Sequence, residues 1–160
     1  MKNGITIGLL GLVLFASGAA AQTATEQGRI LGDFQRSVVD YTQRHKCLNM
    51  FPEAISTETP APKIFTLPVA TVFRQLIART IAAPGGVTIA GSGGTYHAAV
   101  LQPFPANEFI DFPVTLSAAL PPLPSPLEYR LIRNDLAIRD GDADVIIAVL
   151  RDTLGPRTTR

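Results

Sequence analysis

The sequence of residues 127–150, LEYRLIRNDLAIRDGDADVIIAVL, decides the fold of this chain. Apolar and polar side chains alternate in its first two runs, as they do in strands that bury one face. The apolar members are Leu127, Tyr129 and Leu131 in the first run and Leu136 and Ile138 in the second. Because Arg133-Asn134 separates the two runs by two residues, the pattern predicts a β-hairpin of residues 127–132 and 135–140.

Residues 145–150 (VIIAVL) are apolar throughout, and this pattern fits two structures. They form either a buried third strand or a helix capped by Asp142, with Ile146, Leu150 and Leu154 turned inward. Their β-branched side chains favour the strand. We therefore expect a β-meander at the carboxyl end.

Upstream of the hairpin, seven of the thirteen prolines fall within residues 103–126. Since proline interrupts helices, this range is predicted as an extended connector with at most one short helix, Val114–Leu120. Residues 67–82 carry a helical stripe that begins after Thr66 and ends before Pro84. The stripe consists of Val69, Val72, Phe73, Leu76 and Ile77.

Three further elements are predicted before the connector. Residues 23–47 have a helical face, with Thr23 to Glu26 as a capping box at its start. Residues 87–90 have strand character, and the turn 91–94 joins them to a second strand at 96–101. The helical face consists of Ile30, Phe34, Val38 and Tyr41, and Asp40 and Arg44 form an i,i+4 pair beside it.

The amino terminus has the pattern of a secretion signal. Lys2 precedes an apolar run from Ile5 to Ala16, and small residues of the A-x-A type end at Ala21. The run is shorter than the roughly 20 residues of a membrane-spanning helix, so stable insertion is not expected after cleavage. The expected domains are a signal peptide (1–21) and one secreted domain (22–160), in the periplasm or outside the cell.

Charge and cysteine content exclude several classes of function. The chain has 14 Lys and Arg against 13 Asp and Glu, and removing residues 1–21 takes away Lys2 and leaves it formally neutral. A neutral chain lacks the basic surface that binds nucleic acid. A single cysteine, Cys47, forms neither an internal disulfide framework nor a zinc site built on cysteine pairs.

Two catalytic alternatives stay open. Cys47 with His97 has the residue types of thiolate catalysis, and Ser92 lies in a sequence close to the G-x-S-x-G elbow of serine hydrolases. The elbow lacks the helix that should follow the serine, and a single cysteine at a helix end is more often a packed apolar residue. We expect a protein that is not an enzyme and has no cofactor.

Metal binding is the third alternative. Asp140, Asp142 and Asp144 match the first acidic positions of a calcium loop, but Val145 replaces its glycine and Arg151 its last glutamate. These substitutions favour a polar turn. An accessory protein of metal homeostasis in the cell envelope remains an alternative function, although we predict no metal-ligating residue.

The hairpin is the best candidate for a binding surface. Tyr129, Arg130 and Arg139 lie on its neighbouring strands, where an arginine can stack on an aromatic ring or bind a carboxylate. Glu128 and Arg139 could equally form a cross-strand ion pair that only solvates one face. These three residues are the predicted binding set for a small ligand or an envelope protein.

The motif LPPLP at 120–124 followed by LEYR at 127–130, with Asp135-Leu136, Arg139-Asp140 and Asp144, resembles a group of small secreted bacterial proteins with no known activity. The resemblance implies a secreted α+β protein and no particular activity. The hairpin is also loosely similar to the terminal β-module of small periplasmic proteins linked to nickel and cobalt homeostasis.

The prediction is an α+β fold with two amino-terminal helices packed on a small, mostly antiparallel sheet. The expected function is that of an exported, non-enzymatic accessory or binding module.

Overall fold

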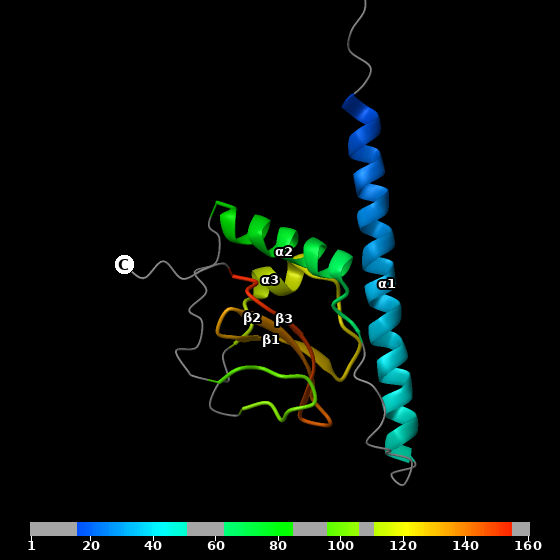
Figure 1. Cartoon of the computed structure of the whole chain (residues 1–160), viewed down its shortest axis with the longest axis vertical. Helices are drawn as coiled ribbons and strands as arrows, with labels where there is room; N and C mark the ends of the chain where they lie inside the picture. Colours follow the sequence, from blue (N-terminus) through cyan, green and yellow to red (C-terminus); the bar gives the residue numbers. More distant parts are fainter. Residues whose placement is uncertain (1–15, 51–62, 85–95, 106–110, 155–160) are drawn as a thin grey trace, which may run out of the picture.

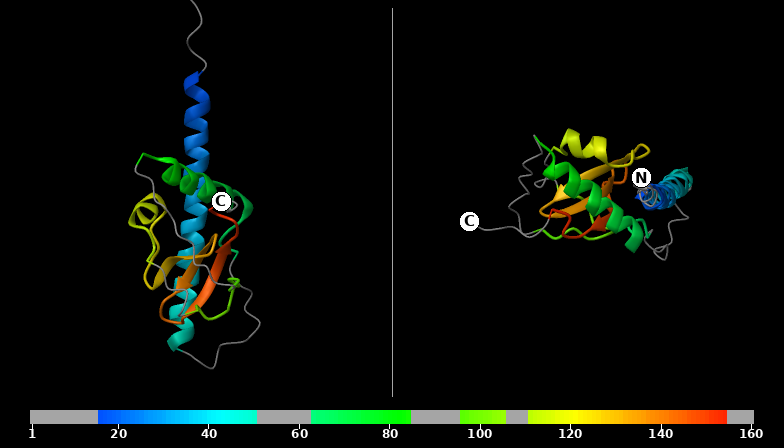
Figure 2. Two further views of the ribbon diagram at one scale, coloured as in Figure 1. Left: turned by 90° about the vertical axis from the view of Figure 1, so that its left-hand side faces the viewer. Right: turned by 90° about the horizontal axis from the view of Figure 1, so that it is seen from above.

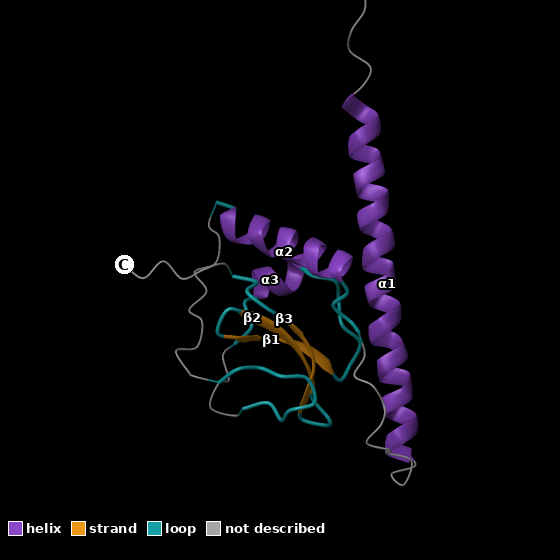
Figure 3. Cartoon of the chain, in the orientation of Figure 1, coloured by secondary structure: helices purple, strands orange, loops and turns teal. Residues whose placement is uncertain are grey.

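The computed structural model describes residues 16–50, 63–84, 96–105 and 111–154, with the side chains of residues 22–45 in the first range. It has helices and a three-stranded antiparallel sheet, so the α+β class is confirmed (Figure 3). The elements are α1 (Ala16–Met50), α2 (Leu67–Ala82), α3 (Val114–Ala119), β1 (Leu127–Ile132), β2 (Asp135–Asp140) and β3 (Val145–Leu150).

The three strands follow one another in the sheet as β1-β2-β3. The register of the hairpin pairs Ile132 with Asp135 across a two-residue turn and Glu128 with Arg139. Residues 145–150 form the third strand, which pairs antiparallel with β2. The register of this pairing shifts between Ile138 and Arg139 of β2. The predicted hairpin and the choice of strand for 145–150 are therefore confirmed.

The main core lies between one face of the sheet and the helices. The predicted apolar face of the hairpin is buried there with the stripe of α2, and Phe73 packs its ring against Phe34 of α1 and Tyr129 of β1. A smaller cluster covers the opposite face, where Phe104 packs with Ile132 and Ile146. Both faces of this sheet are thus partly buried. The alternation of apolar and polar residues in the hairpin had predicted burial of only the face that packs on the helices.

Helix α1 lies beside the body and rises above α2 at its amino-terminal end (Figures 1 and 2). Phe34 and Val38 are fully buried, Tyr41 is partly buried, and residues 22–26 are exposed. The Asp40–Arg44 pair is present on the exposed side at 2.7 Å. Within the described ranges, no helix combines the length and apolar character needed to cross a membrane.

One predicted boundary and one predicted strand are wrong. Helix α1 does not begin at Thr23, because the alanines before it favour helix and the helix extends back to Ala16. Residues 96–101 form no strand: Leu101 has a left-handed φ of 66° and Gln102 donates its N–H to the carbonyl of Ala99 in a turn. The predicted strand at 87–90 and its glycine turn lie outside the described residues.

The short helix of the connector is confirmed, at Val114–Ala119. It ends one residue earlier than predicted, since Leu120 is its extended C-cap. The prolines that follow carry the chain to Leu127, whose N–H donates to the carbonyl of Pro124. The connector thereby places α3 and a proline segment next to β1.

Candidate functional site

An open groove of about 660 Å³ lies between β1 and the end of the connector. Its size is within the range of ligand sites. Most of its lining residues are apolar or aromatic, but polar and apolar atoms contribute about equally to the surface that they expose. The lining residues are Phe112, Val114, Ser117, Ala118, Leu120, Pro121, Pro122, Leu123, Leu127, Glu128, Tyr129 and Arg130.

Tyr129 forms part of the groove and is held firmly in place. Its ring stacks on Phe112 with centroids 5.8 Å apart, and its hydroxyl donates a 2.8 Å hydrogen bond to the carbonyl of Pro121. Burial raises the pKa of the Tyr129 hydroxyl above its ordinary value, so this group stays a donor even in alkaline solution. The aromatic pair gives the groove a rigid apolar surface.

The three residues of the predicted binding set lie on opposite faces of the sheet. Tyr129 faces the main core, whereas Arg130 and Arg139 belong to the opposite face, because successive side chains of a strand alternate. Tyr129 and Arg130 both line the groove, since β1 is an edge strand; Arg139 does not line it. Arg139 instead lies over the ring of Phe104, at 5.3 Å.

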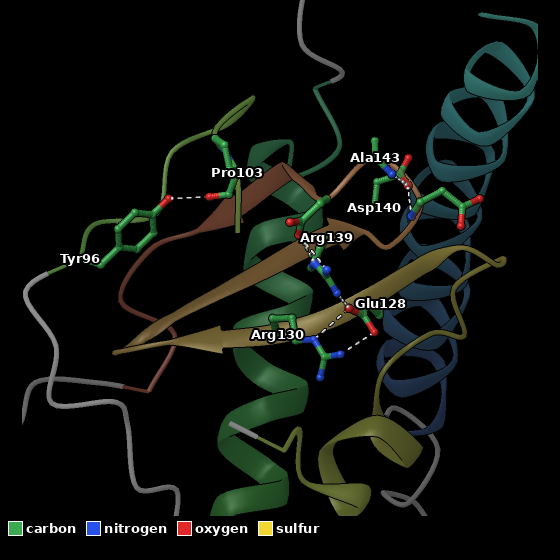
Figure 4. A network of polar contacts seen from close by, with 9 residues as sticks. Tyr96, Pro103, Glu128, Arg130, Arg139, Asp140 and Ala143 are labelled. Carbon is green, nitrogen blue, oxygen red and sulfur yellow. Dashed lines mark hydrogen bonds and ion pairs between the residues drawn. The ribbon is translucent and has the colours of Figure 1, made fainter. Parts of the chain in front are cut away.

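The two arginines share one carboxylate, as Figure 4 shows. Arg139 donates to Glu128 Oε1 at 2.5 Å, and Arg130 donates to both oxygens of Glu128 at 3.0 and 2.6 Å. Arg139 also donates to Asp144 at 2.7 Å. The cross-strand pair of Glu128 with Arg139 is therefore formed, and it is one part of a four-residue network.

Burial alone would raise the pKa of Glu128, but the hydrogen bonds from Arg139 and Arg130 outweigh it and hold this pKa below its ordinary value. A carboxyl whose pKa is lowered by folding stabilises the protein above its unfolded-state pKa, and this stability is lost as the pH falls through the folded-state value. The network is therefore weakened by acid.

Replacing Glu128 by glutamine is expected to lower the free energy of unfolding at pH 7 by about 1 kcal/mol, because both arginines lose a charged partner. The difference between wild type and variant should shrink as the pH falls from 5 toward 3. Urea unfolding across this range measures it. Glu26→Gln is the control, since Glu26 forms an exposed pair on α1. A difference between wild type and Glu128→Gln that stays constant with pH would contradict the role of this carboxylate.

The aspartates of the β2–β3 turn do not converge on one point. Asp140 is fully buried: its Oδ1 accepts the N–H groups of Asp142 and Ala143, and its Oδ2 accepts the Tyr41 hydroxyl at 3.0 Å. The exposed Asp144 pairs with Arg139. Within the described part of the chain, no three His, Cys, Asp or Glu side chains are grouped as metal ligands. This turn links the sheet to α1, near the labels Asp140 and Ala143 in Figure 4.

Both catalytic alternatives use His97, which is exposed and lies beside Arg133 of the β1–β2 turn. Its Nε2 lies 3.4 Å from Arg133 Nη1, beside a second hollow of about 270 Å³ that these two residues line with Asn134, Asp135, Arg151 and Asp152. Ser92 and the side chain of Cys47 lie outside the described residues. Pairing of either nucleophile with His97 thus stays a prediction.

Sequence reasoning missed the groove residues of the connector, namely Phe112, Val114 and Leu120 to Leu123. The concentration of prolines marked an extended segment, but it carried no signal of which strand that segment would lie against.

The fold and the site define a small α+β protein with a groove of mixed apolar and polar surface at the edge of its sheet. Comparison with family models gave no match, and no similar protein was found among curated proteins or solved structures. The resemblance to small secreted proteins stays a prediction.

Proposed function

We propose that this chain is an exported, non-enzymatic binding module, and that the groove beside β1 binds an extended, apolar segment of a partner polypeptide. The single observation that carries this proposal is the composition of the groove: two stacked aromatic rings, a proline wall and leucine side chains alternate with polar groups, which fits the apolar side chains and polar backbone of an extended peptide. Grooves of aromatic side chains are a common means of binding extended apolar or proline-containing peptides.

The charges at the groove favour a polypeptide over a charged small molecule. Glu128 pairs with Arg130 and Arg139, and Arg139 also pairs with Asp144, so this network of two arginines and two carboxylates has no net charge. A ligand with an apolar body and uncharged polar groups loses the least solvation energy there. Export is supported by the amino-terminal signal pattern.

A peptide library tests the proposal. The full chain, expressed with its own amino terminus, is recovered from the bacterial periplasm, and its intact mass is expected to show Gln22 as the first residue. A displayed library of 12-residue peptides is then selected on this protein. Selected peptides are expected to bind Ala118→Arg at least tenfold more weakly, because Ala118 is exposed and lines the groove.

Ala78→Arg is the matched control, since Ala78 is an exposed alanine of α2 outside the groove. It should bind the peptides like the wild type. Failure to enrich any peptide, or equal binding by Ala118→Arg and the wild type, would overturn the groove as the binding site. An unprocessed mass, or a chain that stays in the cytoplasm, would overturn export.

A further inference from the structure

The wall of the groove that faces β1 is the segment 120–124, which contains Pro121 and Pro122 in succession. Proline has no backbone N–H, and extended proline segments have no internal hydrogen bonds. The backbones of Pro121 and Pro122 can therefore form hydrogen bonds only through their carbonyl oxygens. Leu120 anchors the start of the wall in the core, and what binds these two oxygens sets the position of the prolines that follow.

Each of the two carbonyls accepts one side-chain hydrogen bond. The Tyr129 hydroxyl donates to the Pro121 carbonyl at 2.8 Å, and Gln35 Nε2 donates to the Pro122 carbonyl at 2.8 Å. The donors come from β1 and from α1. The wall is thus held by two elements that are remote from each other in the sequence.

The position of Gln35 depends on how α1 docks. The preceding residue, Phe34, packs on Phe73 with ring centroids 4.8 Å apart, and two turns further along α1 Tyr41 donates to Asp140. These contacts fix the rotation of α1 against the body. They thereby place the Gln35 amide at the proline wall.

We propose that Gln35 and Tyr129 are the positioning residues of the groove: they hold two successive carbonyls of its proline wall, so that the shape of the groove depends on the docking of α1. This inference rests on the proposed function and keeps the same ligand class, an extended apolar polypeptide. A change that displaces α1 would then alter binding without touching the ligand.

The test uses two conservative variants of the full chain. Gln35→Glu keeps the size of the side chain, but its carboxylate at pH 7 has no hydrogen to donate to a carbonyl. Tyr129→Phe keeps the ring and removes the hydroxyl. Gln43→Glu is the matched control, because it makes the same chemical change at an exposed position of the same helix.

The first measurement needs no ligand. The order parameter of the Leu123 amide, from ¹⁵N relaxation, is expected to fall from the range of rigid backbone, about 0.85, to below about 0.7 in both variants. It should not change in Gln43→Glu. An unchanged value in Gln35→Glu and Tyr129→Phe would overturn the inference, whether or not a peptide ligand is found.

The second measurement uses the peptide enriched on the wild type. Gln35→Glu is expected to bind it at least threefold more weakly, with the same urea midpoint as Gln43→Glu. Loss of order at Leu123 with unchanged affinity would show that the wall does not position the ligand, which also overturns the inference. Failure to enrich a peptide would overturn the proposed function, and the order parameter would still decide whether the two side chains hold the wall.

Discussion

Replacing Asp140 by alanine is expected to lower the free energy of unfolding by about 2–3 kcal/mol. The carboxylate is fully buried, and it accepts hydrogen bonds from the Tyr41 hydroxyl and from the N–H groups of Asp142 and Ala143. Alanine would remove the acceptor of the half-buried Tyr41 hydroxyl and of two N–H groups of the exposed turn, and a donor left unpaired away from water is costly. Urea unfolding followed by circular dichroism measures the loss.

Tyr41→Phe separates the two parts of this contact. It removes the hydrogen bond to α1 and leaves those within the turn, so a smaller loss of about 1–2 kcal/mol is expected. Burial and the neighbouring Asp140 charge raise the pKa of the Tyr41 hydroxyl, so the hydroxyl is a donor at neutral pH. A loss below about 1 kcal/mol in Asp140→Ala would show that this carboxylate does not hold α1 and the turn together.

Replacing Phe73 by alanine is expected to cost about 3–5 kcal/mol, as is typical of a large buried aromatic side chain. The ring is fully buried and contacts three others: Phe34 of α1 at 4.8 Å, Phe65 at 5.3 Å and Tyr129 of β1 at 6.2 Å between centroids. The cavity left by alanine would therefore loosen α1, α2 and the sheet at once. Thermal and urea unfolding both report the effect.

The control for Phe73 is Gln75→Ala on the same helix. Gln75 is exposed, so the change should stay within about 0.5 kcal/mol. Similar losses in the two variants would contradict the packing of α2 by its Phe73 face. In Phe73→Ala, the near-ultraviolet signal of the aromatic cluster should also decrease.

The proposed function connects these stability predictions to binding. Asp140 and Phe73 both secure α1, and α1 carries the Gln35 amide that holds the groove wall. Variants that loosen α1 without unfolding the chain, such as Tyr41→Phe, would thus be expected to weaken peptide binding as well. A change in how α1 docks is therefore expected to change both the stability of the fold and the affinity of the groove.

Local patterns predicted most of the regular structure. The helix over 67–82 was predicted with its observed bounds, because proline at its start and Pro84 after its end mark both limits. The hairpin followed from alternation and from a two-residue turn. For residues 145–150 the preference of β-branched side chains for strands correctly decided between strand and helix.

The errors arose where longer-range contacts compete with local patterns. Residues 96–101 have the composition of a strand, yet the backbone that meets β3 begins at their last residue. Leu101 donates its N–H to the carbonyl of Ile146, and Pro103 forms an isolated bridge with Val145. The Tyr96 hydroxyl donates to the carbonyl of Pro103, and this hydrogen bond links the two ends of the loop (Figure 4). Composition cannot distinguish a paired strand from such a covering loop, because the difference lies in what the backbone meets.

The sequence by itself determined the α+β class, the second helix and the hairpin, and it favoured a strand over a helix for residues 145–150, since each depends on neighbours in the chain. It left the pairing of Glu128 with Arg139 as one of two alternatives, which the structure decided. Only the tertiary structure decided that Arg139 lies away from the groove and that Phe112 and the proline segment line it beside Tyr129. It also decided that Gln35 reaches Pro122, 87 residues away in the chain. The reason is physical: alternation and turn length act between near neighbours, whereas a groove forms where segments remote in sequence pack together.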